Sequence, residues 1–301
     1  MSANQAHYIG RFAPSPTGPL HFGSLIAAVA SYADALHHQG KWLVRMEDVD
    51  EGRVVRGADH IILSTLEHYG FHWQDEVVYQ SQKLPRYQEI IQQLLTDKRA
   101  YPCSCTRKQI MATGKPGAEG IIYPGACRDQ VSPRPKAVSV RVRTNNHLLS
   151  FTDRIQGPQS QKLATEVGDF LIRRGDGYTA YQLAVVVDDW DQGITHVVRG
   201  ADLLFSTPRQ LLLQQLLNFS QPQYAHVPLA VDQKGRKLSK QGQAPRVSDH
   251  EVVSTLLAVW RFLGQVMPEE APGKPESFWR WAATHWAIHA VPRVRQIIIS
   301  V

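Results

Sequence analysis

The sequence predicts an α/β protein with a parallel, nucleotide-binding core, a small cysteine-containing insertion and a short helical C-terminal part. Three observations support this prediction. A strand, a loop rich in proline and glycine, a helix and a second strand follow one another over residues 8–46, which is how a parallel α/β fold begins. All three cysteines fall within residues 101–138, a stretch with little apolar periodicity. Two helical patterns occupy the last part of the chain.

The first half of the core is expected to span residues 1–100. Tyr8–Phe12 is predicted as a strand, and three prolines and a glycine within residues 13–19 force the next segment into a loop. The run Leu25–His37 is rich in Ala and Leu and is predicted as a helix that ends near Gly40. The remaining elements of this half are a strand at Trp42–Met46 and helices at Arg56–Tyr69 and Pro85–Lys98.

The rest of the chain is divided into four segments. They are a cysteine module (101–137), an insertion or connective region (138–194), the second half of the core (195–245) and a helical C-terminal subdomain (246–301). Strands are predicted at Val138–Val142, Asp169–Ile172, Tyr181–Val187, His196–Arg199 and His226–Val231. Helices are predicted at Ser206–Leu217, Asp249–Phe262 and Glu276–Ala287.

Composition and charge restrict the class of protein. The chain has 301 residues, of which 43% are hydrophobic, and a net charge of +6, which favours a polyanionic partner such as nucleic acid. Many cytosolic proteins are equally basic without such a partner. The first seven residues are polar, and no apolar stretch approaches the roughly 20 residues that cross a bilayer. With only three cysteines, we expect a cytoplasmic protein with no membrane partner.

The loop after the first strand is the first candidate site, with the sequence RFAPSPTGPLHFGS over residues 11–24. This junction of an α/β fold presents backbone N–H groups and a positive helix end to phosphates. Gly23 would let a nucleotide approach the backbone closely, and His21 can donate a hydrogen bond to a phosphate oxygen. Taken alone, the same residues also suit an ordinary turn with a surface histidine.

A second candidate site is Lys237-Leu238-Ser239-Lys240, where two lysines flank a serine. Compact ammonium charges suit a triphosphate, although a solvated basic loop has the same appearance. The cysteines Cys103, Cys105 and Cys127 offer three thiolates, one fewer than the four ligands zinc prefers. The residues alone therefore leave open zinc, with Tyr123, Asp129 or water as fourth ligand, and buried free cysteines.

Taken together, these motifs resemble a known family. His21-Phe22-Gly23-Ser24 and Lys237-Leu238-Ser239-Lys240-Gln241 resemble the HIGH and KMSKS signatures of class I aminoacyl-tRNA synthetases. Residues 11–18, 198–204 and 232–240 are similar to the glutamyl-tRNA synthetase subfamily, and the resemblance covers residues 8–245. Two features differ from that subfamily: Ser24 stands in place of the final His, and residues 246–301 are too few for an anticodon-binding region. A chain of this length with HFGS and a cysteine module resembles the glutamyl-Q tRNA(Asp) synthetase family.

The resemblance implies a class I synthetase Rossmann-like nucleotide-binding core with a zinc-module insertion. It also implies ATP-dependent activation of L-glutamate without tRNA, followed by transfer of glutamate to queuosine in the anticodon of tRNA(Asp). One structural Zn²⁺ and a Mg²⁺ that accompanies ATP belong to this expectation, and we expect a monomer.

The resemblance also assigns site residues. Glutamate carries two carboxylates and an ammonium, which suits guanidinium groups and a carboxylate in its pocket, although each such residue also suits an ordinary ion pair. The residues implied for L-glutamate are Arg11, Phe12, Ala13, Pro14, Ser15, Glu47, Tyr181 and Arg199. Those implied for ATP are His21, Gly23, Ser24, Lys237 and Lys240, with His21 and Lys240 as the catalytic pair. The family places a tyrosine four residues before the last cysteine, so the implied metal ligands are Cys103, Cys105, Tyr123 and Cys127.

Three alternatives remain at this point. The first is a truncated glutamyl-tRNA synthetase that charges tRNA(Glu). The second is another nucleotidyltransferase with a His-x-Gly loop, which would not need Arg11, Glu47 and Arg199 together. The third is a non-catalytic tRNA-binding or amino-acid-sensing paralogue, which Ser24 suggests.

Overall fold

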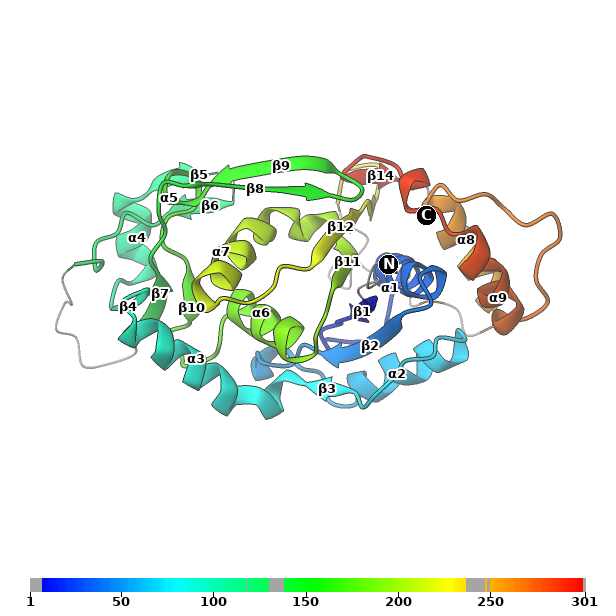
Figure 1. Cartoon of the computed structure of the whole chain (residues 1–301), viewed down its shortest axis with the longest axis horizontal. Coiled ribbons are helices and arrows are strands. Elements are labelled where there is room, and N and C mark those ends of the chain that lie inside the picture. The colour runs from blue at the N-terminus through cyan, green and yellow to red at the C-terminus, as the bar shows by residue number, and fades with distance from the viewer. Residues whose placement is uncertain (1–6, 118, 130–137, 237–246, 248–249, 300–301) are drawn as a thin grey trace, which may run out of the picture.

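The computed structural model describes residues 7–117, 119–129, 138–236, 247 and 250–299. Figure 1 shows an elongated molecule with parallel strands near its middle. The part that carries the cysteines lies at one end, and helices α8 (Val252–Phe262) and α9 (Pro275–His285) lie at the other. In the described part of the chain, no helix combines the length and the apolar character needed to cross a membrane.

The first half of the core is a parallel three-stranded sheet in the order β1 (Ile9–Phe12), β2 (Lys41–Met46), β3 (Val78–Tyr79). Helix α1 (Phe22–His37) connects β1 to β2. This half also contains two short 3₁₀-helices, η1 (Glu51–Arg53) and η2 (Gln80–Lys83), and the α-helices α2 (Ala58–His68) and α3 (Leu84–Thr96).

The second half of the core pairs β11 (His196–Gly200) with β12 (Gln223–Val227) in parallel, with η3 (Ala201–Ser206) and α7 (Thr207–Leu217) between them. Strand β11 follows directly on Thr195, whose backbone N–H donates to the Ile9 carbonyl of β1 (2.9 Å). Strands β1 and β11 lie side by side, with β2 next to β1 and β12 next to β11 on the opposite side (Figure 1). The strand order therefore reverses between β1 and β11, which is where open α/β sheets bind ligands.

The sequence between the two halves of the core forms an antiparallel sheet in the order β10 (Leu171–Arg173), β7 (Ser139–Val142), β4 (Ala100–Cys103). A small helix and two hairpins accompany it: α4 (Arg107–Thr113), β5–β6 (Lys115–Gly117 and Gly120–Ile122), β8–β9 (Leu148–Asp153 and Gly157–Lys162), and the helical turn α5 (Leu163–Glu166). The β8–β9 hairpin reaches back along the molecule toward β12 (Figure 1), where the Arg154 N–H donates to the Tyr224 carbonyl (2.8 Å).

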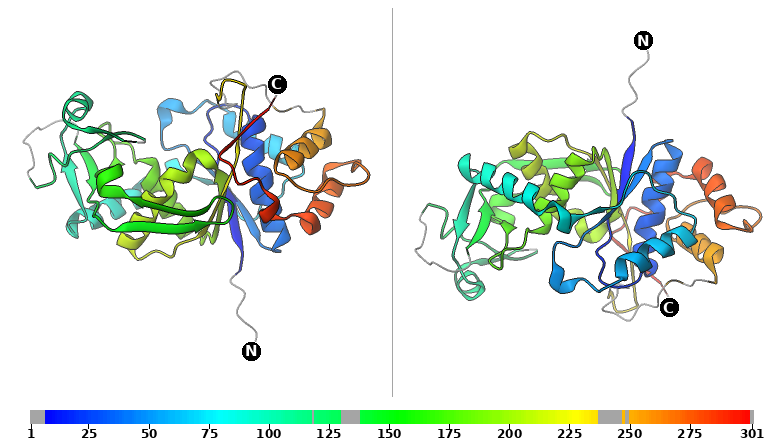
Figure 2. Two further views of the ribbon diagram at one scale, coloured as in Figure 1. Left: turned by 90° about the horizontal axis from the view of Figure 1, so that it is seen from above. Right: turned by 90° about the horizontal axis from the view of Figure 1, so that it is seen from below.

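Helix α1 is the centre of the larger hydrophobic core. Its residues Leu25, Ile26 and Ala28–Ala35 are all buried, which makes it a helix packed on every side. Helices α8 and α9 pack beside α1 (Figure 2), with Trp260 and Trp279 buried. The tryptophans near the C-terminus therefore contribute to the core, as their apolar neighbours predict. A short helix η5 (Ile288–Ala290) and strand β14 (Gln296–Ile298) follow, and β14 pairs in parallel with β13 (Leu229–Val231).

The prediction of a strand at Tyr181–Val187 is wrong, because this segment belongs to helix α6 (Tyr181–Asp191). All of Leu183–Asp189 is buried, so the helix is surrounded on every face. A helix buried in this way has no polar face, and its apolar run cannot be told from a buried strand by periodicity. The β-branched residues Val185–Val187 then favoured the wrong alternative.

The predicted strand His226–Val231 is in fact parts of two strands, β12 and β13, separated at Pro228. Proline has no N–H for a strand ladder, which explains the interruption. The other predicted strands and helices are present, with ends that differ by a few residues.

Candidate active site

A cavity of about 470 Å³ lies at the carboxyl ends of β1 and β11, where the strand order reverses. It collects every residue predicted to bind glutamate or ATP that lies within the described part of the chain: Arg11, Phe12, Ala13, Pro14, Ser15, His21, Gly23, Ser24, Glu47, Tyr181 and Arg199. Lys237 and Lys240 lie outside the described residues. Segments as distant in sequence as β1, β2, α6 and β11 therefore contribute to one cavity.

Two buried arginines, Arg11 and Arg45, lie near the carboxyl ends of the neighbouring strands β1 and β2. Arg11 is in β1, and its Nε–H donates to Asp189 Oδ1 (3.2 Å). Asp189 also accepts a hydrogen bond from Nη2 of Arg45 (2.8 Å), a buried residue of β2. Although burial opposes ionisation, the charges of Arg11 and Arg45 hold the pKa of Asp189 below its usual range. Asp189 therefore serves as a fixed anion that holds Arg11 at the cavity.

Glu47 directly follows β2 and lies 3.9 Å from Arg45 Nη2. Burial raises the pKa of Glu47 to about 7, although the positive charges of Arg45 and Arg11 act in the opposite direction. With this pKa, the Glu47 carboxyl changes between its protonated and ionised forms near neutral pH. A cation bound in the cavity would favour the ionised form.

Arg199 lies next to the last residue of β11, and its guanidinium group has several hydrogen-bond partners. Its Nε–H donates to His226 Nε2 (3.0 Å), and its Nη2 donates to Thr207 Oγ1 (2.9 Å). The hydroxyl of Tyr181 lies 3.5 Å from Nη1. Arg199 and Tyr181 both line the cavity, so a guanidinium group and a phenol face the same ligand space.

His21 lies at the N-terminus of α1. The Ser24 backbone N–H donates to His21 Nδ1 (3.2 Å), and Ser24 Oγ lies 3.0 Å from His21 Nε2. This capping explains why α1 begins at Phe22, three residues before the predicted start at Leu25. Gly23 and Ser24 consequently lie in the first turn, where helix N–H groups attract anions.

Several residues around the cavity were not predicted from the sequence. Asp202, Leu203 and Arg53 line it. Asp189 binds Arg11 and is itself bound by Arg45. One signal was present in the sequence: Asp188 and Asp189 end an apolar run, and Arg45 interrupts another. Charged residues within buried segments require a partner, and such a partner is often part of a site.

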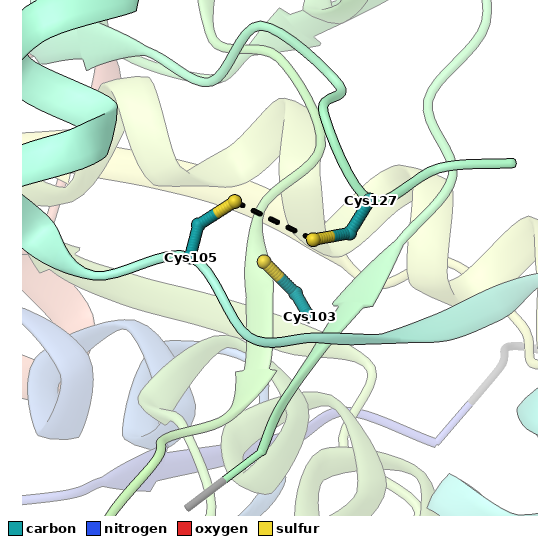
Figure 3. A group of neighbouring side chains, drawn as sticks. All are labelled: Cys103, Cys105 and Cys127. Atoms are coloured by element: carbon teal, nitrogen blue, oxygen red, sulfur yellow. Dashed lines mark hydrogen bonds between the residues drawn. The ribbon is translucent and has the colours of Figure 1, made fainter. Parts of the chain in front are cut away.

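The side chains of the three cysteines point toward one another (Figure 3), with their sulfur atoms within 4.8 Å of one another. Cys105 Sγ lies 3.4 Å from Cys127 Sγ, and the Tyr123 hydroxyl lies 3.3 Å from Cys103 Sγ and 3.5 Å from Cys105 Sγ. Ligands of a tetrahedral zinc ion are separated by roughly 3.5–3.8 Å, given Zn–S and Zn–O bonds of about 2.3 and 2.0 Å. Three sulfurs and this oxygen therefore fit one zinc ion.

The surroundings also favour a metal centre. Arg141 donates from Nε to Cys103 Sγ (3.4 Å), and its guanidinium carbon lies 3.9 Å from the centre of the Tyr123 ring. Burial raises the pKa of Cys105 to about 11. At Cys127 burial also opposes ionisation, but hydrogen bonds from the Ser104 backbone and Cys105 lower the pKa to about 7. A cationic group and an ionisable thiol suit thiolate ligation.

Comparison with known proteins places this architecture in context. Residues 9–256 match the family model described as tRNA synthetases class I (E and Q), catalytic domain. A relative from Aromatoleum aromaticum, called glutamyl-Q tRNA(Asp) synthetase, is 49% identical over 291 residues, which is 96% of this chain and 92% of that protein. A relative of the same name from Pseudomonas aeruginosa strain LESB58 is 50% identical over 287 residues, covering 95% and 96% of the two chains.

Among solved structures, a glutamate-tRNA synthetase from Elizabethkingia anophelis superposes with a TM-score of 0.81 at 22% sequence identity. The match covers 98% of this chain and 68% of that protein. At this level of identity, the similarity demonstrates a shared fold.

Proposed function

Because the chain belongs to the glutamyl-Q tRNA(Asp) synthetase family of class I tRNA synthetases, we propose that it activates L-glutamate with ATP and transfers the glutamyl group to queuosine in the anticodon of tRNA(Asp). One observation supports this function most strongly. A single cavity contains two buried arginines, Arg11 and Arg199, with the carboxyl group of Glu47 and the phenol of Tyr181, beside the N-terminus of α1. It therefore offers an amino-acid site and a phosphate site next to each other.

The charges of the cavity match those of glutamate. The guanidinium groups of Arg11 and Arg199 can each bind a carboxylate, and Glu47 can pair with the substrate ammonium. The loop from Phe12 to Ser15 completes the wall between β1 and α1. An uncharged or basic amino acid would leave at least one of these buried charges without a partner, which disfavours its binding.

The first reaction forms glutamyl-adenylate. An oxygen of the glutamate α-carboxylate attacks the α-phosphorus of ATP, the new O–P bond forms, and pyrophosphate leaves with the electrons of the broken P–O bond. We assign stabilisation of the phosphates to His21, to the N–H groups of Gly23 and Ser24, and to Lys237 and Lys240, which lie outside the described residues. Positioning and charge provide the catalysis, without a protein nucleophile.

In the second reaction, a hydroxyl group of queuosine attacks the carbonyl carbon of the adenylate. An ester forms, and AMP leaves. The acceptor is the finer part of the proposal, and it rests on the names of the relatives.

Two metal ions accompany this function. Cys103, Cys105, Tyr123 and Cys127 would hold a structural Zn²⁺, which ties β4 to the segment after β6. Glu47 and Asp202 are the carboxylates that line the described cavity. We therefore propose that Mg²⁺ enters bound to ATP, where it neutralises phosphate charge, and is held mainly by the triphosphate.

Glutamate-dependent ATP–pyrophosphate exchange in the absence of tRNA tests the first reaction. We expect exchange with L-glutamate and little with L-glutamine or L-aspartate. Transfer is then tested with radiolabelled glutamate and an anticodon stem-loop of tRNA(Asp) that carries queuosine, with the same loop carrying guanosine as the matched control. Label on the queuosine loop alone supports the proposal, whereas label on the 3′ end of tRNA(Glu) would identify a charging enzyme.

A further inference from the structure

Arg199 has one edge that the protein already occupies. Its Nε–H is bound to His226 Nε2 (3.0 Å), and the adjacent Nη2 is bound to Thr207 Oγ1 (2.9 Å), with a longer contact to the Leu203 carbonyl (3.4 Å). His226 and Thr207 are fully buried, and neither lines the cavity. The edge formed by Nη1 and Nη2 is on the other side, next to the Tyr181 hydroxyl (3.5 Å). A carboxylate can therefore bind Arg199 in a bidentate manner only through this second edge.

The contact with His226 determines which ring nitrogen carries the proton. A guanidinium Nε–H is always a donor, so His226 Nε2 must accept and the proton must be on Nδ1. Nδ1 lies 2.6 Å from Asp153 Oδ2, which accepts that proton in a hydrogen bond. A protonated imidazolium would place an N–H against the N–H of Arg199. Burial and the charge of Arg199 accordingly lower the pKa of His226 to about 4.

Asp153 is fixed by the backbone around it. Its Oδ1 accepts from the N–H groups of Ile155 (3.0 Å), Gln156 (2.8 Å) and His226 (3.1 Å). Asp153 ends strand β8, so the tip of the β8–β9 hairpin is attached to the strand that supports Arg199. The hairpin thereby orients an arginine of the cavity without touching the cavity itself.

We propose that Asp153 and His226 are positioning residues for substrate recognition: they lock Arg199 so that only its Nη1–Nη2 edge meets a carboxylate of the substrate. This inference rests on the proposed binding of glutamate at Arg199. It adds two residues to the site and assigns a role to the β8–β9 hairpin. Replacement of His226 should thus affect glutamate recognition, although His226 itself does not reach the ligand.

Glutamate-dependent ATP–pyrophosphate exchange measures this role. We expect His226→Ala to raise the KM for glutamate roughly ten-fold, the effect of losing one hydrogen bond to a charged group, with less than about a two-fold change in the KM for ATP. His226→Gln places an amide oxygen near the position of Nε2 and should restore most of the affinity. Arg199→Lys lacks Nε–H, so adding His226→Ala to it should have little further effect.

A matched control is His196→Gln, at the other end of the same strand β11. His196 contacts Thr195 Oγ1 (2.8 Å) and stacks on Tyr8, away from the cavity. Its replacement should leave the KM for glutamate unchanged. The proposal is overturned if His226→Ala leaves the KM for glutamate unchanged. It is also overturned if His226→Ala raises this KM by the same factor in the wild type and in the Arg199→Lys variant.

Nitrogen NMR of the histidine rings gives a test that needs no activity. In the wild-type protein at neutral pH, we expect His226 to be neutral with its proton on Nδ1; a proton on Nε2 contradicts the proposed contact. The two proposals fail differently. Wild-type protein without glutamate-dependent exchange would refute the function, whereas normal exchange that is insensitive to His226 would refute only the positioning role.

Discussion

The proposed pairing of Glu47 with the substrate ammonium predicts that glutamate binding depends on pH. Burial raises the pKa of this carboxyl to about 7, against the charges of Arg45 and Arg11. The substrate ammonium can pair only with the ionised form. We therefore expect the KM for glutamate to rise as pH falls below about 7, by roughly ten-fold between about pH 8 and about pH 6, because one pKa unit corresponds to a ten-fold change.

Glu47→Gln is the control for this prediction. It should bind glutamate weakly at every pH, with a flat profile through the same range. A wild-type KM that stays constant from about pH 8 to about pH 6 would separate Glu47 from recognition of the ammonium.

The same pKa has a consequence for stability. The pKa of Glu47 is higher in the folded protein than its ordinary value of 4.5, so the folded state keeps a proton that the unfolded state releases between about 4.5 and 7. This carboxyl thus contributes fully to stability below about 4.5, and the contribution is lost as pH rises through about 7. In urea unfolding at about pH 8, Glu47→Gln should consequently be more stable than the wild type; a lower unfolding midpoint would contradict this.

We propose that the cysteine module, residues 101–137, depends on a metal cross-link between its segments. Strand β4 supplies Cys103, whereas Cys127 lies after the β5–β6 hairpin, and few apolar side chains connect the two. A metal ion would replace a hydrophobic core here. We expect about one zinc per chain in freshly purified protein. Cys105→Ser should lower the zinc content and accelerate hydrogen exchange in residues 101–129.

Ser104→Ala is the matched control for the module. Ser104 lies between two of the cysteines, and its hydroxyl is 3.9 Å from Cys127 Sγ, but it is not among the proposed ligands. This variant should retain zinc. Wild-type protein that contains no zinc would mean that the three cysteines are buried free thiols.

Helix α6 shows why the type of an element matters for the site. It begins at Tyr181, which lines the cavity, and two turns later Asp189 contacts Arg11. A residue spacing of eight brings side chains to the same side of a helix. One helix therefore provides both a ligand-facing phenol and the anion that holds Arg11.

The net charge of +6 predicts that binding of the anticodon stem-loop depends on salt concentration. Binding of a polyanion releases condensed counterions, so affinity falls as salt rises. We expect the logarithm of the association constant for the anticodon stem-loop to decrease linearly with the logarithm of the salt concentration, as measured by fluorescence anisotropy. ATP–pyrophosphate exchange should change much less over the same range. Salt-independent binding of the stem-loop would exclude phosphate contacts as the main source of affinity.

The α/β class, most of the elements and part of the cavity lining could be predicted from the amino-acid sequence. These features are encoded locally: residues 13–19 have prolines and glycine at positions that favour a loop, and Leu25–His37 has the composition of a buried helix. The predicted roles of the site residues and the division into five segments stay predictions. Lys237 and Lys240 were also identified only from sequence.

Contacts between residues far apart in sequence could be found only in the folded structure. The identity of α6 as a helix and the hydrogen bonds from Asp153 through His226 to Arg199 both follow from packing between segments far apart in sequence. Asp153 and His226 are 73 positions apart, and each alone looks like an ordinary polar residue. Periodicity reports which side of an element is buried, but not which element covers it. Buried polar groups must find partners, and the partner is set by the fold as a whole.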